Sequence, residues 1–117
     1  MNTQTDGSTL IFRWHDSLNQ RGASFTSGMD DFPRPELSNG HIDLQVWMYF
    51  FTKVMVEVSH IFEQSNQKYI NNLELIKNNF KYFINPVDNT YRDISSDSSF
   101  SLHFGYPNIL PIAFGIP

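Results

Sequence analysis

The sequence contains no cysteine among its 117 residues. Disulfide frameworks, cysteine-ligated zinc sites and thiol catalysis are therefore excluded. It also lacks an apolar run that approaches the roughly 20 residues needed by a transmembrane helix. Its eight lysines and arginines are outnumbered by twelve aspartates and glutamates and form no basic patch, which argues against nucleic acid as a partner. Aromatic residues are abundant at 15%, and such side chains serve both as core and as flat apolar platforms for sugars.

The N-terminal part of the chain shows little periodicity. We expect residues 1–9 to be a disordered leader and residues 10–117 to be at most one domain or a fragment of a larger one. The apolar run 10–14 is expected to be extended. Residues 15–40 contain glycines, prolines and serines without a helical or strand period, so they predict a long loop, and loops of this length are usually functional or disordered. Apolar anchors such as Phe25 and Phe32 favour an ordered loop.

The segment 42–62 predicts a long helix. Ser38 and Asn39 offer an N-cap just before it. Fourteen of its 21 residues are apolar, and the stretch 46–51 is apolar at every position. Many of these residues are β-branched or aromatic, but the length favours a helix over a strand. Because a helix that is apolar all round must be buried on every side, we expect another chain or a larger protein to cover it.

A second helix is predicted over residues 67–83. Its apolar side chains recur at spacings of four and three residues, which places them on one helix face. Those side chains are Tyr69, Leu73, Ile76, Phe80 and Phe83. Only a few residues near Ser65 and Asn66 join the two helices, so they are expected to form an antiparallel hairpin. Pro107 suits the first position of a third helix, although Pro111 and Gly115 weaken that prediction.

The segment 26–34, Thr-Ser-Gly-Met-Asp-Asp-Phe-Pro-Arg, carries the chemistry. Asp30 and Asp31 are adjacent carboxylates between Gly28 and Pro33, and Arg34 follows. A carboxyl group in an apolar setting can have a raised pKa and act as a general acid, while the arginine keeps the other one ionised. The same composition is also that of a solvated turn. The residues alone leave both interpretations open.

Residues 27–34 resemble the Ser-Gly-Leu/Met-Asp-Asp-Tyr/Phe-Pro-Arg signature of processing α-glucosidase I, the mannosyl-oligosaccharide glucosidase of glycoside hydrolase family 63. Three further segments resemble the family in the same order along the chain. They are Phe12-Arg13-Trp14, His41-Ile42-Asp43-Leu44 with Trp47, and Phe104-Gly105-Tyr106 with Leu110-Pro111. The resemblance therefore covers almost the whole chain, from about residue 10 to residue 116.

This resemblance implies an all-α fold that is a partial (α/α)6 barrel, with a few of its helices and the active-site loop. Residues 42–62 would be a core-facing helix, and residues 67–83 its outer partner. It implies that Asp30 is the general acid of an inverting glycosidase. The implied substrate-binding residues are Asp31, Phe32, Arg34, Arg13 and Trp14. The general base, a glutamate in the family, is expected beyond the region covered here.

The implied activity is removal of the terminal α-1,2-linked glucose from the Glc3Man9GlcNAc2 N-glycan precursor. The partners would then be the N-linked oligosaccharide and the remainder of the catalytic domain, without a cofactor or metal. The family implies a location on the lumenal side of the endoplasmic reticulum membrane. Two alternatives stay open: another inverting (α/α)6 glycosidase such as a trehalase, and a non-catalytic all-α interaction module.

Several other residues have competing interpretations. Trp47 is expected in the core more than as a sugar platform, because it lies mid-helix among apolar residues. Asp43 suits the positive end of the helix and equally suits support of the site. A metal site at His41 with Asp43, or at Glu57 with His60, is disfavoured against a helix start and a solvated face. The aspartates of the loop 86–101 are expected to be solvated. They are Asp88, Asp93 and Asp97.

Overall fold

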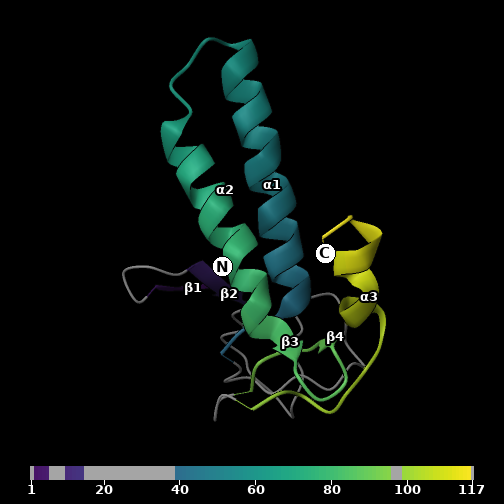
Figure 1. Cartoon of the computed structure of the whole chain (residues 1–117). Helices are drawn as coiled ribbons and strands as arrows, with labels where there is room; N and C mark the ends of the chain where they lie inside the picture. The colour runs from purple at the N-terminus through teal and green to yellow at the C-terminus, as the bar shows by residue number, and fades with distance from the viewer. Residues whose placement is uncertain (1, 6–9, 15–38, 96–98, 117) are drawn as a thin grey trace.

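The computed structural model describes residues 2–5, 10–14, 39–95 and 99–116. Its elements follow one another as strands, a helical hairpin, a small sheet and a last helix (Figure 1). They are β1 (Asn2–Thr5), β2 (Leu10–Arg13), α1 (Ile42–Ile61), α2 (Gln67–Asn79), the 3₁₀ helix η2 (Phe80–Phe83), β3 (Ile84–Asn85), β4 (Thr90–Tyr91) and α3 (Tyr106–Ala113). The fold is mostly helical, in agreement with the expected helical class, and two small antiparallel two-stranded sheets accompany the helices.

The two predicted long helices are confirmed as an antiparallel hairpin (Figure 1). α1 ends one residue before the predicted boundary, and α2 tightens into η2 over the last turn of the predicted second helix. At the end of α1, Glu63 has a left-handed backbone with φ 53°. Its N–H donates to the carbonyl of His60 and the N–H of Gln64 to that of Ser59. This is a Schellman ending, in which glycine is the usual residue at the left-handed position.

One face of α1 packs against α2. Gln45, Thr52 and Ser59 recur every seven residues and are all buried, and Nε2 of Gln45 donates to the carbonyl of Ile76 in α2 at 3.4 Å. Thr52 and Ser59 are small, so the two helices can approach closely along this face. Tyr49 adds an edge-on ring contact with Phe80, with centroids 5.8 Å apart.

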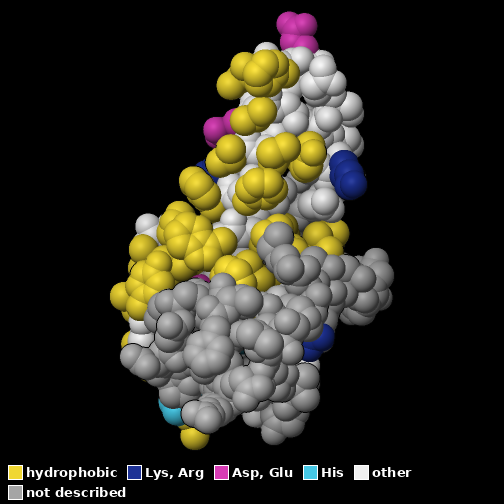
Figure 2. All heavy atoms as spheres, turned by 180° about the vertical axis from the view of Figure 1, so that it is seen from behind, with side chains coloured by type: hydrophobic (Ala, Val, Ile, Leu, Met, Phe, Trp, Pro, Cys, Tyr) yellow, Lys and Arg dark blue, Asp and Glu magenta, His cyan; other side chains and the backbone are white. Residues whose placement is uncertain are grey.

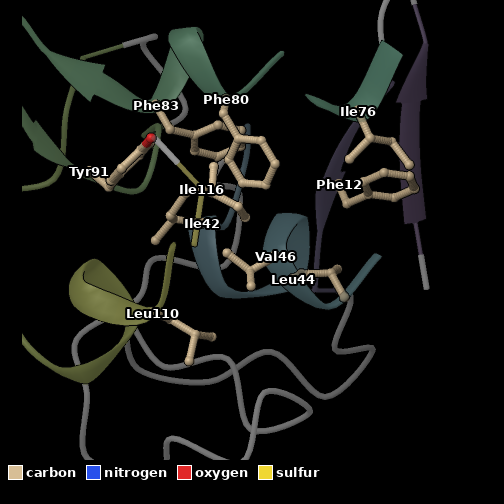
Figure 3. Packing of buried hydrophobic residues seen from close by; sticks show 10 residues of the cluster. All are labelled: Phe12, Ile42, Leu44, Val46, Ile76, Phe80, Phe83, Tyr91, Leu110 and Ile116. Atoms are coloured by element: carbon tan, nitrogen blue, oxygen red, sulfur yellow. The ribbon is translucent and has the colours of Figure 1, made fainter. Parts of the chain in front are cut away.

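The buried core lies where the hairpin meets the strands and α3. Ten hydrophobic residues form one cluster, which Figure 3 shows. They are Phe12, Ile42, Leu44, Val46, Ile76, Phe80, Phe83, Tyr91, Leu110 and Ile116. Only Ile42, Leu44 and Val46 come from α1. The first turns of α1 are therefore anchored in the core, whereas the rest of the helix contributes no residue to this cluster.

Residues 2–5 of the N-terminal segment form a strand. β1 pairs antiparallel with β2, and the register joins Asn2 to Arg13 and Thr5 to Leu10. The extended conformation predicted for residues 10–14 is confirmed in β2. Residues 6–9 lie outside the described residues, and the division into a leader and one domain stays a prediction.

The last helix is present despite its internal proline. Pro107 lies in the first turn of α3, one residue after its start at Tyr106. α3 ends in a second Schellman motif: Gly115 has φ 74°, its N–H donates to Ile112, and the N–H of Ile116 donates to Pro111. Asn108 ties α3 to β4 through a 2.7 Å hydrogen bond from its Nδ2 to the carbonyl of Tyr91.

The face of α1 turned away from α2 is apolar and exposed. The exposed side chains recur at spacings of four and three residues, and hydrophobic side chains are visible along the hairpin from behind (Figure 2). They are Trp47, Phe51, Val54, Val58 and Ile61. Trp47, expected in the core, is 40% exposed and packs its ring against Phe114 at 5.3 Å. Within the described ranges, no helix is long and apolar enough to cross a membrane.

Candidate functional site

The described residues on either side of segment 15–38 lie together: Phe12 and Trp14 before it and Gly40 and His41 after it form what we call the stem. The backbone N–H of Trp14 donates to Nδ1 of His41 at 2.8 Å, and the N–H of His41 donates to the carbonyl of Phe12 at 2.9 Å. Gly40 exchanges backbone hydrogen bonds with Ile94. The described residues just before and just after the segment that carries the Asp-Asp-Phe-Pro-Arg motif are therefore held together at one place.

Gly40 is required at this stem by its close packing. A Cβ atom at this position would lie 2.9 Å from Cγ2 of Ile11 and 3.0 Å from the ring of Phe83. Real Cβ atoms essentially never approach that closely, so a larger residue would push β2 away from η2. The absence of a side chain lets the incoming strand, the 3₁₀ helix and the start of α1 pack together.

His41 accepts its hydrogen bond at the stem through a neutral imidazole. Its side chain is fully buried, and Nδ1 accepts a hydrogen bond, so Nδ1 carries no proton and the imidazole is neutral. The side chain of His41, the N-cap residue of α1, makes no capping hydrogen bond to the helix. The N–H of Ile42 donates instead to Oδ1 of Asp93 at 2.9 Å. Asp93 is 5% exposed, which corrects the expectation that it is a solvated loop charge.

Asp43 connects the start of α1 to Trp14. The indole Nε1–H of Trp14 donates to Oδ1 of Asp43 at 3.1 Å, and the N–H of Leu44 donates to the same oxygen at 2.8 Å. Asp43 is 2% exposed and lies in the first turn of the helix, where the helix dipole favours a negative charge. Asp43 therefore lies at the positive N-terminal end of α1 and also holds the indole of Trp14, which is a predicted site residue.

Gln45 was missed by the sequence interpretation. Its Oε1 accepts the N–H of Phe12 at 3.1 Å, and its Nε2 donates to the carbonyl of Leu10 at 3.0 Å. Nδ2 of Asn79 donates to that same carbonyl at 3.0 Å. β2 is thereby held by amide side chains from both helices. The available signal was a glutamine inside an otherwise apolar helix, because a buried polar group needs hydrogen-bond partners.

The predicted site residues divide into two groups. Arg13 is the last residue of β2 and Trp14 follows it; both are partly buried. The structure brings Trp14 to His41 and Asp43 at the start of α1. The predicted acid and its neighbours, Asp30, Asp31, Phe32 and Arg34, lie outside the described residues. Their orientation around a substrate therefore stays a prediction.

The last segment that resembles the family begins at Phe104, just before α3, and continues into that helix. The N–H of Gly105 donates to Oδ1 of Asn108 at 2.7 Å, which caps the start of the helix. Phe104 stacks under the guanidinium of Arg92 at 5.1 Å, and that arginine also forms an ion pair of 3.0 Å with Asp88. Asp88 is exposed, as expected. Thr90 and Arg92 lower its pKa, chiefly through the hydrogen bond from the hydroxyl of Thr90.

Other candidate sites lie elsewhere in the described part of the chain. A hollow lined by Val56, Glu57, His60, Ile61 and Asn66 is found at the outer end of the hairpin. It includes the pair Glu57 and His60 that the sequence raised as metal ligands. Within the described ranges, no group of three or more histidine, aspartate or glutamate residues is arranged to hold a metal ion.

Comparison with known proteins gives one match. The family model described as "Glycosyl hydrolase family 63 C-terminal domain" matches residues 1–111. No curated protein and no solved structure matches the chain significantly. The matched range contains segment 26–34, the stem and the whole helical hairpin. The family match and the motifs that resemble the family lie on the same stretch of sequence. The chain therefore belongs to glycoside hydrolase family 63, a family of glycosidases.

Proposed function

We propose that this chain carries the general-acid side of the glucose subsite of an inverting α-glucosidase. Its substrate would be the terminal α-1,2-linked glucose of the Glc3Man9GlcNAc2 N-glycan. The family match over residues 1–111 is the observation that carries the proposal. The stem supports it, because Trp14 and His41 fix both ends of the segment that contains Asp30.

The proposed chemistry divides the work between two carboxyl groups. Asp30 donates its proton to the leaving glycosidic oxygen, and a second carboxylate activates water on the opposite face of the sugar, about 6.5–9.5 Å away. Asp31, Phe32, Arg34 and Arg13, with Trp14, line the glucose. The two buried aspartates near the stem, Asp43 and Asp93, already accept backbone N–H groups. As the resemblance to the family implies, we assign the base to a glutamate in another part of the catalytic domain.

The proposed partner is the remainder of that domain, arranged as an (α/α)6 barrel. The exposed apolar face of α1 supports this proposal, since Phe51 is 57% and Ile61 72% exposed in the chain alone. Exposed apolar patches of this kind mark interaction surfaces. The proposed location is the lumenal side of the endoplasmic reticulum membrane, where N-glycan precursors are trimmed.

Sugar binding tests the substrate class. We expect the folded chain, titrated by calorimetry, to bind an α-1,2-linked glucose disaccharide at least tenfold more tightly than trehalose, a difference of about 1.4 kcal/mol. Arg34→Ala should weaken that binding, and Lys53→Ala on the exposed side of α1 is the matched control. Tighter binding of trehalose would favour the trehalase alternative. A folded chain that binds neither sugar would favour the interaction module.

Asp30→Asn tests the acid in an enzyme that contains this chain together with the base. The amide cannot supply a titratable proton, so turnover should fall about 10²–10⁴-fold, while sugar affinity stays unchanged because the amide is nearly isosteric. The chain alone should release no glucose from the triglucosylated glycan, because one half of the catalytic pair is missing. Wild-type turnover in the asparagine variant would exclude Asp30 as the acid.

A further inference from the structure

Both polar hydrogens of Trp14 are used inside the protein. Its backbone N–H donates to His41 and its indole N–H to Asp43. The indole has no other polar hydrogen and no acceptor atom. The side chain of Trp14 therefore has no hydrogen-bonding group left for a ligand. What remains available is the flat apolar ring of a residue that is only partly buried.

We propose that Asp43 is a positioning residue that fixes the Trp14 indole as a stacking platform for the apolar face of a pyranose ring. This inference rests on the proposed function, which places Trp14 in the glucose subsite. It adds a role for Asp43 and a mode of contact for Trp14: the ring face, not the N–H, meets the sugar.

The carboxylate of Asp43 is suited to this task because it is itself immobile. It is almost completely buried, and Oδ1 also accepts the N–H of Leu44 in the first turn of α1. A rigid helix end thus sets the position of the indole edge. Trp14 is held at a second point by His41, two residues before Asp43, and the two hydrogen bonds, one to its backbone and one to its ring edge, restrict the rotation of the indole.

The hydrogen-bond geometry also separates two kinds of substitution at position 14. Trp14→Phe keeps an aromatic ring face but loses the N–H that faces Asp43 and the second ring of the indole. Trp14→Leu loses the ring face as well. If the ring face carries the contact, calorimetry should show a loss of sugar affinity of more than tenfold for the leucine variant. The loss for the phenylalanine variant should be smaller and close to that of Asp43→Leu, because both of these substitutions remove the bond between Asp43 and the indole while an aromatic face remains. Equal losses in both variants would overturn the stacking role.

Asp43 can be tested by tryptophan fluorescence of the 117-residue chain. The sequence holds two tryptophans, so Trp47→Phe leaves Trp14 as the only reporter. In this background we expect an α-1,2-linked glucose disaccharide to produce a saturable change in Trp14 emission. Asp43→Leu should shift the emission of the free protein and weaken sugar binding about tenfold. Asp43→Asn should restore both, because its amide oxygen accepts the same indole hydrogen bond.

Two controls separate positioning from stability. Glu57→Gln removes a carboxylate from the exposed part of α1 and should change neither readout. Val46→Ala destabilises the same helix start from a buried position and should lower the melting temperature without changing the sugar affinity of the folded protein. Sugar binding that is equal in the Asp43→Leu and Glu57→Gln variants would overturn the positioning role alone. A folded Trp47→Phe chain that binds no sugar by calorimetry would overturn the proposed function, and this inference with it.

Discussion

The side-chain amide of Gln45 accepts the backbone N–H of Phe12 at 3.1 Å, across 33 positions of the sequence. The bond is buried, and the same amide donates to the carbonyl of Leu10. β2 pairs with β1 on one edge, and on its other edge this one side chain of α1 takes the place of a second neighbouring strand. In a sheet, such backbone groups would be paired by another strand, and here they are paired by an amide that has both a donor and an acceptor.

Gln45→Leu should therefore destabilise the chain strongly. Leucine fills a similar volume but leaves the buried N–H of Phe12 without its acceptor, which costs about 1–3 kcal/mol. Urea unfolding should show the loss as a lower free energy of unfolding. Gln64→Leu is the control, because Gln64 is exposed and its replacement should change stability by less than about 0.5 kcal/mol. An equal effect of both substitutions would contradict the role of Gln45 in pairing the backbone of β2.

Glu63→Gly should stabilise the end of α1. Glu63 occupies the left-handed position of a Schellman motif with φ 53°, and a residue with a Cβ atom pays about 1–2 kcal/mol there. After the larger backbone entropy of glycine is counted, we expect a gain near 0.5–1 kcal/mol in thermal unfolding. Gly115→Ala is the reciprocal test. Gly115 occupies the same position after α3 with open space around it, so the loss of stability there would be conformational and not steric.

Phe51→Lys with Ile61→Lys should reduce self-association. Both side chains are more than half exposed on the apolar face of α1, and large apolar patches promote aggregation. We expect the parent chain to associate, and the double variant to shift toward a monomer in light scattering. Lys53→Glu, on another exposed face of the helix, should leave association unchanged. A parent chain that is monomeric at the same concentration would contradict this expectation.

Tyr91→Phe should change stability at alkaline pH. Burial raises the pKa of Tyr91 above 10.0, its ordinary value. Because the unfolded chain loses this proton first, the contribution of the neutral phenol is fully present below pH 10 and is lost as the pH rises through the folded pKa. The free energy of unfolding of the parent should therefore fall more steeply above pH 10 than that of the phenylalanine variant. Identical slopes would contradict the burial effect.

The helices were predictable because their signals are local. Apolar spacing in α2 and the short connection after α1 determine the hairpin without information from the rest of the chain. The third helix was a weaker prediction because Pro111 removes a backbone donor. Its capping by Asn108 and its glycine ending offset that loss.

The stem was not predictable because its partners are distant in sequence. Asp93 caps α1 from 51 positions away, and Asn79 reaches Leu10 from 69 positions away. Nothing in the composition around Asp93 distinguishes a buried capping aspartate from a solvated one. The catalytic motif is the opposite case. The resemblance of the sequence implies roles for Asp30 and Arg34, but their geometry stays a prediction.

The long separations at the stem have a consequence for the order in which the chain folds. The α1–α2 hairpin closes over only residues 62–66, so its loop-closure entropy is small. Docking β2 onto the hairpin closes loops of 27 to 69 residues, which costs more entropy and is slower to achieve. We expect the hairpin to form early and β2 to lock in place last. The segment that carries the motif would then gain its fixed ends only in the final step of folding.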